Sequence, residues 1–436
     1  MSFKLEDEFI ISEGEEVAVL RTPGWAKRLR VTFPAFEERN FRLYFGGQFI
    51  SLIGSWLQVV AQGWLVLELT HSAFWVGVVA ALSSVPILIF ALVGGVIVDR
   101  FPKKKVLIIT QALAMLCAFF LGLFTILQMA TILIICIFAF LLGVVNALDI
   151  PARQAFIPEM MGKKHLASAI SLHAAIFNGS RILGPAFAGI LIGLVGLGGT
   201  FFLNAVSFIA VIVSLFLMRV DSHVAQHHLH PIAAILEGLH YAFSRASIRM
   251  LLIVASVVSI FGWSYASILP VVAQEVFHQD ATGLGYLFTA TGLGALLSVL
   301  LISVYARRIG SHKFILGGNL LLGFSLLLFS FVHRFDAGLF LMFCTGLALT
   351  SQFSIMNSTI QHMVDDSVRG RVMSIYVLMF RGTAPIGALL MGYVAQHFGS
   401  QSAIRWGSLV VLATAAVLFM KSDTIPSLKK KDWQTA

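Results

Sequence analysis

The chain has 436 residues, 58% of them hydrophobic and 12% charged, and its mean hydropathy is +0.90. This composition excludes a soluble globular protein of the same length, because soluble domains carry about 25% charged residues. The formal net charge of +9 is compatible with nucleic-acid binding, but the cations lie in short loops beside long apolar runs, where they set membrane topology. We therefore expect a chain that lies in the lipid bilayer and has no nucleic-acid partner.

Twelve apolar runs are long enough to cross a bilayer, whose hydrocarbon core requires about 20 mostly apolar residues per helix. They cover residues 41–68, 73–98, 105–128, 131–148, 167–195, 199–219, 249–272, 282–306, 313–332, 337–361, 372–398 and 401–421. The pattern predicts an all-α polytopic membrane protein with twelve transmembrane helices. The expected division is a cytosolic tail (1–40), a six-helix bundle (41–219), a cytosolic linker with an amphipathic helix (220–248), a second six-helix bundle (249–421) and a cytosolic tail (422–436).

The distribution of Lys and Arg predicts the orientation. If the loop at 99–105 is cytosolic, all but four of the 30 cations are cytosolic, the exceptions being Arg181, Arg334, Arg381 and Arg405. Such a bias places both termini in the cytoplasm. The three cysteines lie in apolar runs without the spacing of a zinc site, and the linker histidines His227, His228 and His230 are expected to be solvated. We expect no metal and no cofactor.

The loop between the second and third runs, residues 95–105, places one acid and four cations between two apolar runs. A carboxylate here can lie against the positive N-terminal end of another helix, while the cations stay in the cytosol. The loop resembles the motif G-x-x-x-D-R-x-G-R/K-R/K of the major facilitator superfamily, with Pro102 where glycine is usual. Its matching positions are Gly95, Asp99, Arg100, Lys103 and Lys104. We expect these residues and Arg371, at the start of span 11, to form a conformational latch. An ordinary basic turn would explain the lysines alone.

An internal repeat appears when the two halves are compared. At an offset of 207 residues, four positions of the first half recur in the second: Arg42, Trp56, Glu68 and His71 fall on Arg249, Trp263, Glu275 and His278. The halves therefore look like parallel six-span repeats, the arrangement of major facilitator carriers. The loop motif has decayed in the second copy, which predicts a one-sided latch.

Two arginines, Arg181 and Arg381, lie inside spans 5 and 11, where a cation normally faces a cavity or a partner. Each is followed four residues later by a proline that bends the helix, Pro185 or Pro385. The stretch around the first, which includes Gly184 and Gly189, partly resembles the fifth-span motif of major facilitator exporters. We expect both arginines to face a substrate cavity and to attract an anionic group. The alternative is a snorkelling arginine beside a helix kink.

Stripes of neutral polar residues are candidates for the remaining cavity wall. Span 1 carries Gln48, Ser55, Gln58 and Gln62 on one helical face, span 7 carries Trp263 near three serines, and span 10 carries Asn357 and Gln361. Helix–helix hydrogen bonds explain such stripes equally well.

Proton coupling requires an ionisable group that the cavity can reach. The candidates are Glu68 and Glu275 at the outer ends of spans 1 and 7, Asp149 at the inner end of span 4, and His173 in span 5. For each one, a structural role is the alternative.

Three stretches, residues 149–159, 237–241 and 369–374, resemble the bacterial branch that holds the enterobactin exporter and related macrolide and multidrug efflux carriers. The resemblance implies export across the inner membrane driven by the proton gradient, but the substrate does not follow from it. We expect a monomeric carrier of a small organic molecule, either siderophore-type or a drug. A receptor or scaffold on a carrier fold is one alternative. An intramembrane enzyme is another, with His362 and Asp366 as its acyltransferase-like pair, and we do not expect it.

Overall fold

The computed structural model describes residues 33–162, 165–220, 231–365 and 368–421, and every regular element in that part of the chain is a helix. The first half contains η1 (Pro34–Glu37), α2 (Arg39–Thr70), α3 (Ala73–Arg100), α4 (Lys103–Ile126), α5 (Ile132–Met161) and α6 (Leu166–Leu217). The linker helix is α7 (Pro231–Ser244). The second half contains α8 (Ala246–Val257), η2 (Val258–Trp263), α9 (Tyr265–Glu275), α10 (Ala281–Ile309), α11 (Ser311–Phe329), α12 (Phe335–Met363), α13 (Arg369–Arg381), α14 (Ala384–Phe398) and α15 (Ser400–Met420).

Helix α6 supplies two membrane spans. It has 52 residues, so at about 1.5 Å per residue it is more than twice as long as the roughly 30 Å hydrocarbon core. Its backbone leaves the helical region at Gly196, where φ is 72°. Glycine fits this position because a side chain is disfavoured at positive φ. The described residues form 11 continuous stretches long and apolar enough to cross a membrane, and the division at Gly196 brings the spans to the expected twelve.

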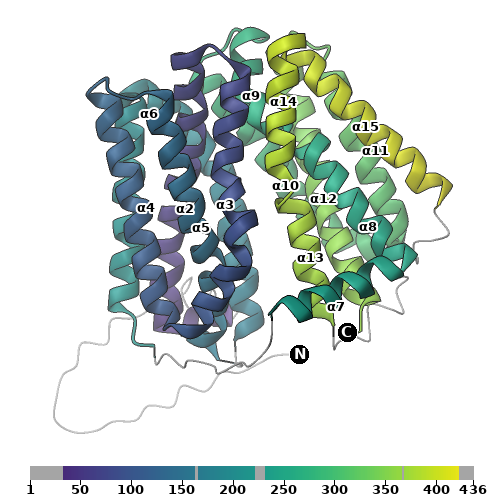
Figure 1. Ribbon diagram of the computed structural model, residues 1–436, viewed down its shortest axis with the longest axis horizontal. Helices are drawn as coiled ribbons and strands as arrows, with labels where there is room; N and C mark the ends of the chain where they lie inside the picture. The colour runs from purple at the N-terminus through teal and green to yellow at the C-terminus, as the bar shows by residue number, and fades with distance from the viewer. Residues whose placement is uncertain (1–32, 163–164, 221–230, 366–367, 422–436) are drawn as a thin grey trace, which may run out of the picture.

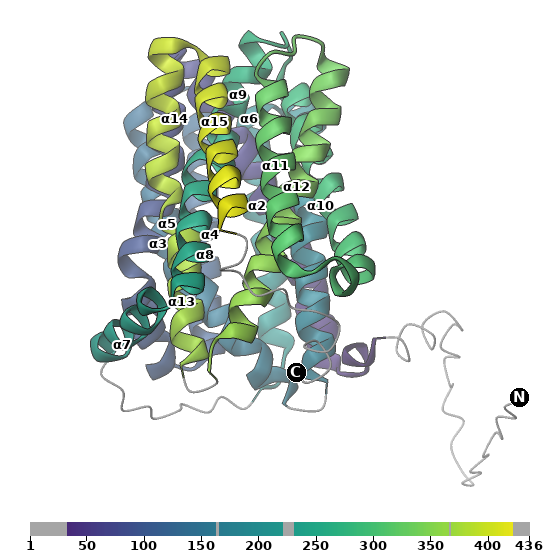
Figure 2. The ribbon, with the colours of Figure 1, turned by 90° about the vertical axis from the view of Figure 1, so that its right-hand side faces the viewer.

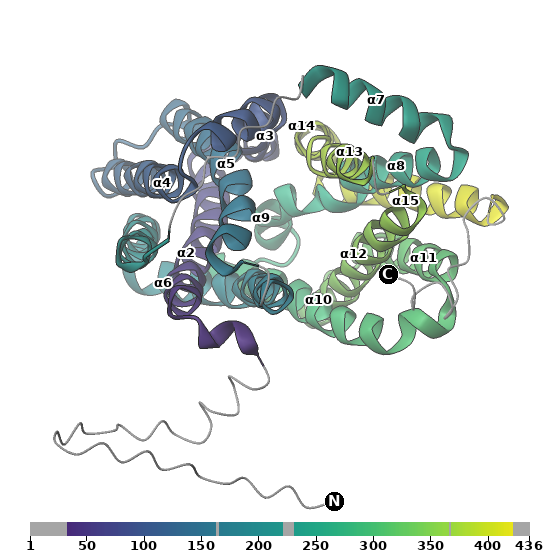
Figure 3. The same ribbon diagram turned by 90° about the horizontal axis from the view of Figure 1, so that it is seen from below.

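The two halves form two helical bundles side by side. Figure 1 shows α2 to α6 on one side and α8 to α15 on the other. Seen along the helices in Figure 3, α7 runs along the edge of the second bundle, next to α13 and α8. Figure 2, which faces the second bundle, shows α7 at the end where α13 begins. We call this the α7 end of the molecule.

Matching local geometry supports the internal repeat. His71 and His278 follow the ends of α2 and α9, and both adopt left-handed backbone angles, with φ of 46° and 51°. Arg42 and Arg249 each donate from Nη1 to a carbonyl oxygen six residues earlier, at 2.8 and 2.9 Å. The equivalent arginines thus make the same contact at the start of the first span of each half, and the equivalent histidines have the same backbone conformation after its end.

The halves contact each other on the side away from α7. Ser72, just before α3, donates a hydrogen bond to Oε1 of Gln396 in α14 at 2.7 Å. One turn further along α3, a Cβ added to Gly77 would lie 2.5 Å from the carbonyl oxygen of Ala388 and 3.0 Å from Cα of Gly392. Small residues allow this close approach of backbones within the membrane.

Two spans of the second half are interrupted near their middle. The span that begins with α8 passes through the π-helical turn η2, and the span that begins with α13 breaks between Arg381 and Ala384. The interruptions touch, because Ser259 donates to the carbonyl oxygen of Phe380. Pro385 occupies the second position of α14, where its missing N–H costs no hydrogen bond.

Candidate functional site

A cavity of about 400 Å³ lies between the halves and is lined by both. From the first half it receives Gln58, Gln62, Asp149 and Arg181, and from the second half Trp263, Tyr265 and Phe288. The volume is typical of a site for one small organic molecule. Val76 and Ala388 also line the cavity, and the Ser72–Gln396 contact lies beyond them at the end opposite α7.

The polar stripe of α2 is divided between the cavity and the protein interior. Ser55, Gln58 and Gln62 line the cavity. Gln48 is buried but does not line it, and its Nε2 has no partner. Gln58 accepts a hydrogen bond from Nδ2 of Asn204 in α6 at 2.5 Å. At Gln58 both expected roles, cavity wall and helix–helix contact, are therefore present.

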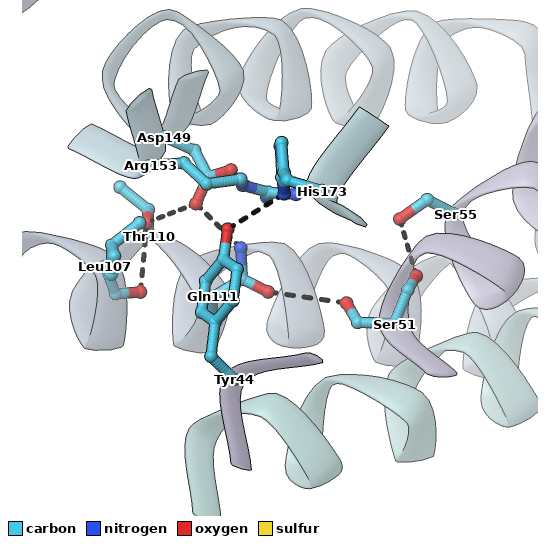
Figure 4. Close-up of polar contacts among 9 residues, drawn as sticks. All are labelled: Tyr44, Ser51, Ser55, Leu107, Thr110, Gln111, Asp149, Arg153 and His173. Atoms are coloured by element: carbon cyan, nitrogen blue, oxygen red, sulfur yellow. Dashed lines mark hydrogen bonds and ion pairs between the residues drawn. The ribbon is translucent and has the colours of Figure 1, made fainter. Parts of the chain in front are cut away.

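Asp149 forms the centre of a buried polar network (Figure 4). Asp149 is only 2% exposed. Its carboxylate forms an ion pair with Arg153, which lies one turn later on α5. Oδ1 of Asp149 also accepts hydrogen bonds from Thr110 at 2.9 Å and from Gln111 at 2.7 Å, both in α4. The carboxylate of Asp149 thus contacts one cation and two neutral donors, and these contacts join α4 to α5.

The network reaches α2 through Gln111, whose Oε1 accepts a hydrogen bond from Ser51 at 3.4 Å. Figure 4 also shows the hydroxyl of Tyr44, another residue of α2, pointing toward the His173 ring of α6. These atoms are 3.2 Å apart, between the hydroxyl oxygen and Nδ1. Among the four proton-coupling candidates, Asp149 lines the cavity and His173 does not.

Glu68 and Glu275 lie far from this network, at the ends of α2 and α9 away from α7. Both are exposed. Glu68 accepts a hydrogen bond from the indole of Trp64 at 2.6 Å, and Glu275 accepts one from Ser400 at 3.3 Å. Neither lines the cavity.

The two equivalent arginines have different surroundings. Arg181 lines the cavity, and its Nη2 donates to Oγ1 of Thr350 in the opposite half at 3.2 Å. Arg381 is the last residue of α13, is exposed and does not line the cavity. Helix α6 continues through Pro185, whereas the second span is interrupted before Pro385.

The glycines near Pro185 are contact points. A Cβ at Gly189 would lie 2.5 Å from Cα of Thr282 in α10, and Gly184 packs against the side chain of Trp56.

In the second half, Trp263 lines the cavity, whereas Asn357 and Gln361 do not. Nε2 of Gln361 instead donates to Oδ1 of Asn357 at 2.6 Å.

The expected latch is described only in part. The backbone of Gly95 and Asp99 belongs to α3, but the burial of these two residues and the Asp99 side chain lie outside what the structure describes. Arg100 is exposed, Lys103 is buried, and Lys104 donates from Nζ to the carbonyl oxygen of Met218 at 2.7 Å. The latch residue of the second half, Arg371, forms an ion pair with Glu237 of α7, with 2.6 Å between Nη1 and Oε2.

Further contacts hold α7 against the second half. Tyr241 donates to Oδ2 of Asp365 at 2.8 Å, and Arg245 forms an ion pair with the same oxygen at 3.2 Å. The histidines His227, His228 and His230 and the enzyme candidate Asp366 lie outside the described residues. Among the residues that the structure describes, no cluster of His, Cys, Asp and Glu could hold a metal ion.

Sequence reasoning missed several residues that complete the site. Arg153, Gln111 and Asn204 line the cavity, and the buried Thr110 donates a hydrogen bond to Asp149. One signal was available, since Asp149 and Arg153 are four residues apart and therefore lie on one helical face. The others are neutral side chains in apolar runs, and only their partners on other helices distinguish them.

Two six-span halves around one central cavity define a membrane carrier of the major facilitator type. The family model described as "Transmembrane secretion effector" matches residues 31–435. The chain therefore belongs to this family, and its expected major facilitator fold is confirmed.

Curated relatives include proteins with named substrates. The chain is 30% identical to the staphyloferrin A transporter of Staphylococcus aureus, over 86% of this chain and 94% of that protein. It is 25% identical to the multidrug efflux pump Tap of Mycolicibacterium fortuitum, over 87% of this chain and 94% of that protein. It is 21% identical to the enterobactin exporter EntS of Escherichia coli, over 85% of this chain and 89% of that protein, which confirms the expected branch.

Among solved structures, the fold matches a bacterial homologue of the human lysosomal transporter Spinster, crystallised in an inward-facing and unoccupied conformation. The TM-score is 0.71 at 13% identity, and the match covers 95% of this chain and 100% of the other. This likeness establishes the fold.

Proposed function

We propose that the protein is a secondary active exporter of the bacterial inner membrane. It moves a small organic molecule of siderophore type out of the cell by alternating access, in exchange for protons. The observation that carries the proposal is a cavity shared by both halves, with the halves in contact at the end opposite α7. The relatives that transport staphyloferrin A and enterobactin support a siderophore-type cargo.

The α7 end is assigned to the cytosol because the cations lie there. Arg100, Lys103 and Lys104 lie between α3 and α4 at this end, and Arg245 and Arg371 lie on α7 and α13 or next to them. Such an excess marks the cytosolic side. In this orientation the described conformation is closed toward the outside, which is the state that receives cargo from the cytosol.

Asp149 is the proposed proton-coupling group. A proton that binds its carboxylate cancels the charge that pairs with Arg153, and both side chains line the cavity. Protonation therefore changes the charge of the cavity wall, and a proton gradient can bias the two access states through this change. His173 and Tyr44 lie next to this network on its α2–α6 side.

The test is transport by the purified protein in liposomes under an imposed proton gradient. Export from the compartment that faces the α7 end should accelerate when protons flow the opposite way. It should lose this acceleration when a protonophore is added or when Asp149 is replaced by Asn. Transport that ignores both the gradient and a protonophore would remove the coupling proposal.

Efflux of lipophilic drugs is a second candidate function. It is favoured by the aromatic part of the cavity wall, formed by Trp56, Trp263 and Phe288, and by the similarity to the multidrug efflux pump Tap. Two measurements on a deletion strain separate the candidates. Loss of a siderophore from the medium supports the first, and increased drug sensitivity with unchanged siderophore secretion supports the second.

A further inference from the structure

The charges of the cavity wall do not balance. Its described acidic and basic side chains are Asp149, Arg153 and Arg181. Asp149 and Arg153 form an ion pair and cancel. Arg181 remains, so the wall carries one positive charge without a counter-charge.

The guanidinium of Arg181 also has an unused hydrogen-bond donor. Its Nη2 contacts the neutral hydroxyl of Thr350, while its Nε is buried and has no partner. A buried charge without a counter-ion and a buried donor without an acceptor are both costly. An arginine keeps such a position where a ligand supplies what the protein lacks.

Arg405 provides a comparison within the same chain. It also lies inside a span, and its Nε is also buried without a partner. However, its guanidinium lies 4.1 Å from the centre of the Phe331 ring, its Nη2 donates to the carbonyl oxygen of Ser330 at 3.4 Å, and it does not line the cavity. The ring and the carbonyl account for Arg405 as a packing residue. The interactions described for Arg181 are with the hydroxyl groups of Thr350 and Tyr265, and both of these residues are neutral.

We propose that Arg181 is a binding site for an anionic group, a carboxylate in particular, of the exported molecule. The proposal deepens the proposed function and rests on it. A carboxylate fits because guanidinium presents a planar set of donors that matches its two oxygens. Thr350 orients the guanidinium from the opposite half, and the aromatic residues Trp263 and Phe288 are available to the apolar part of the cargo.

The test uses two probes of equal size that differ in charge at pH 7, namely 2,3-dihydroxybenzoate and its neutral amide, 2,3-dihydroxybenzamide. Binding to the purified full-length protein in detergent is measured by calorimetry. The wild-type protein should prefer the carboxylate by about tenfold or more, since a hydrogen bond to a charged group contributes that much. Absence of a preference in the wild-type protein overturns the proposal without the use of any variant.

Variants then assign the preference to one side chain. Arg181→Gln should abolish the preference for the carboxylate, because it weakens binding of the carboxylate by about tenfold more than binding of the amide. Arg181→Lys, which keeps the charge but not the planar fork, should retain part of it. Arg405→Gln, the matched control, should behave as the wild type. Retention of the full preference in Arg181→Gln, or its loss in Arg405→Gln, overturns the assignment.

Two features of this experiment separate loss of anion binding from unfolding and from loss of proton coupling. Thermal unfolding is measured on the same samples, and if Arg181→Gln does not fold, the comparison of Arg181→Lys with the wild type decides. The assay is at equilibrium without a gradient. Failure of proton coupling would therefore leave the anion preference intact, and loss of the preference would leave proton-driven export of a neutral or cationic cargo possible.

Discussion

Replacement of Gly77 by Ala should open the contact between the halves at the end opposite α7. The new Cβ would lie 2.5 Å from the carbonyl oxygen of Ala388 and 3.0 Å from Cα of Gly392, whereas carbon and oxygen atoms in close contact are about 3.3–3.6 Å apart. Helices α3 and α14 must therefore separate by close to 1 Å. The neighbours are backbone atoms, so no side-chain rotation relieves the overlap.

The magnitude follows from the cost of overpacking, about 1–3 kcal/mol. This cost applies only to the state in which α3 and α14 touch. Since about 1.4 kcal/mol corresponds to a factor of ten, the equilibrium between the access states should shift by roughly 5- to 150-fold away from the described conformation. The protein should otherwise stay folded.

The assay is chemical cross-linking across the same contact. Cysteines are introduced as Ser72→Cys and Gln396→Cys, at positions whose native side chains are hydrogen-bonded at 2.7 Å, in a protein whose three natural cysteines have been replaced. Gly77→Ala should lower the cross-linking yield. The matched control is Gly317→Ala, because an added Cβ there meets nothing within 4 Å. An unchanged yield in Gly77→Ala, or an equal decrease in both variants, would refute the reasoning.

Three further predictions concern charges. Asp99→Asn should reach the membrane folded but lose most transport, because it removes the acid of the expected latch. Normal transport in this variant, with expression confirmed, would mean that the loop only sets the membrane topology. Glu237→Gln should release Arg371 and lower the free energy of unfolding slightly, by the salt-sensitive effect of under about 1 kcal/mol expected for a partly exposed pair. An effect insensitive to salt contradicts that origin. Asp149→Asn should lower the free energy of unfolding by about 3–5 kcal/mol, because it leaves the largely buried Arg153 side chain without its partner. The added change Arg153→Gln should restore part of the loss, and independent additive effects would exclude the pairing as the cause.

The fold could be predicted because lipid restricts the possible backbone arrangements. A chain that crosses the bilayer must satisfy its backbone hydrogen bonds within each helix, so run length alone predicts the spans. The runs at 167–195 and 199–219 predicted two separate spans. In the structure both belong to the continuous helix α6, whose backbone leaves the helical conformation at Gly196, between the two runs. The internal repeat was likewise visible in single residues, and His71 and His278 both adopt left-handed backbone angles in the segments that follow α2 and α9.

The candidate site was less predictable because rotation of each helix about its axis is set by packing. Arg181 and Arg381 look equivalent in the sequence, yet only Arg181 lines the cavity. The break before Ala384 leaves Arg381 at the end of a helix, exposed. The spacing predicted one polar stripe on α2, but the spacing alone could not distinguish the cavity-lining Gln58 and Gln62 from the buried Gln48.

By itself, the sequence determined that the chain is a twelve-span carrier with two related halves and one strongly basic side, because hydropathy, periodicity and loop charge are local properties. The tertiary structure decided which charges meet. It pairs Asp149 with Arg153 and joins Arg371 to Glu237, and it leaves Arg181 in the cavity wall without an acidic partner. Pairing depends on distances between helices remote in sequence, and in a medium of low dielectric constant a few ångströms separate a neutralised charge from one available to a ligand.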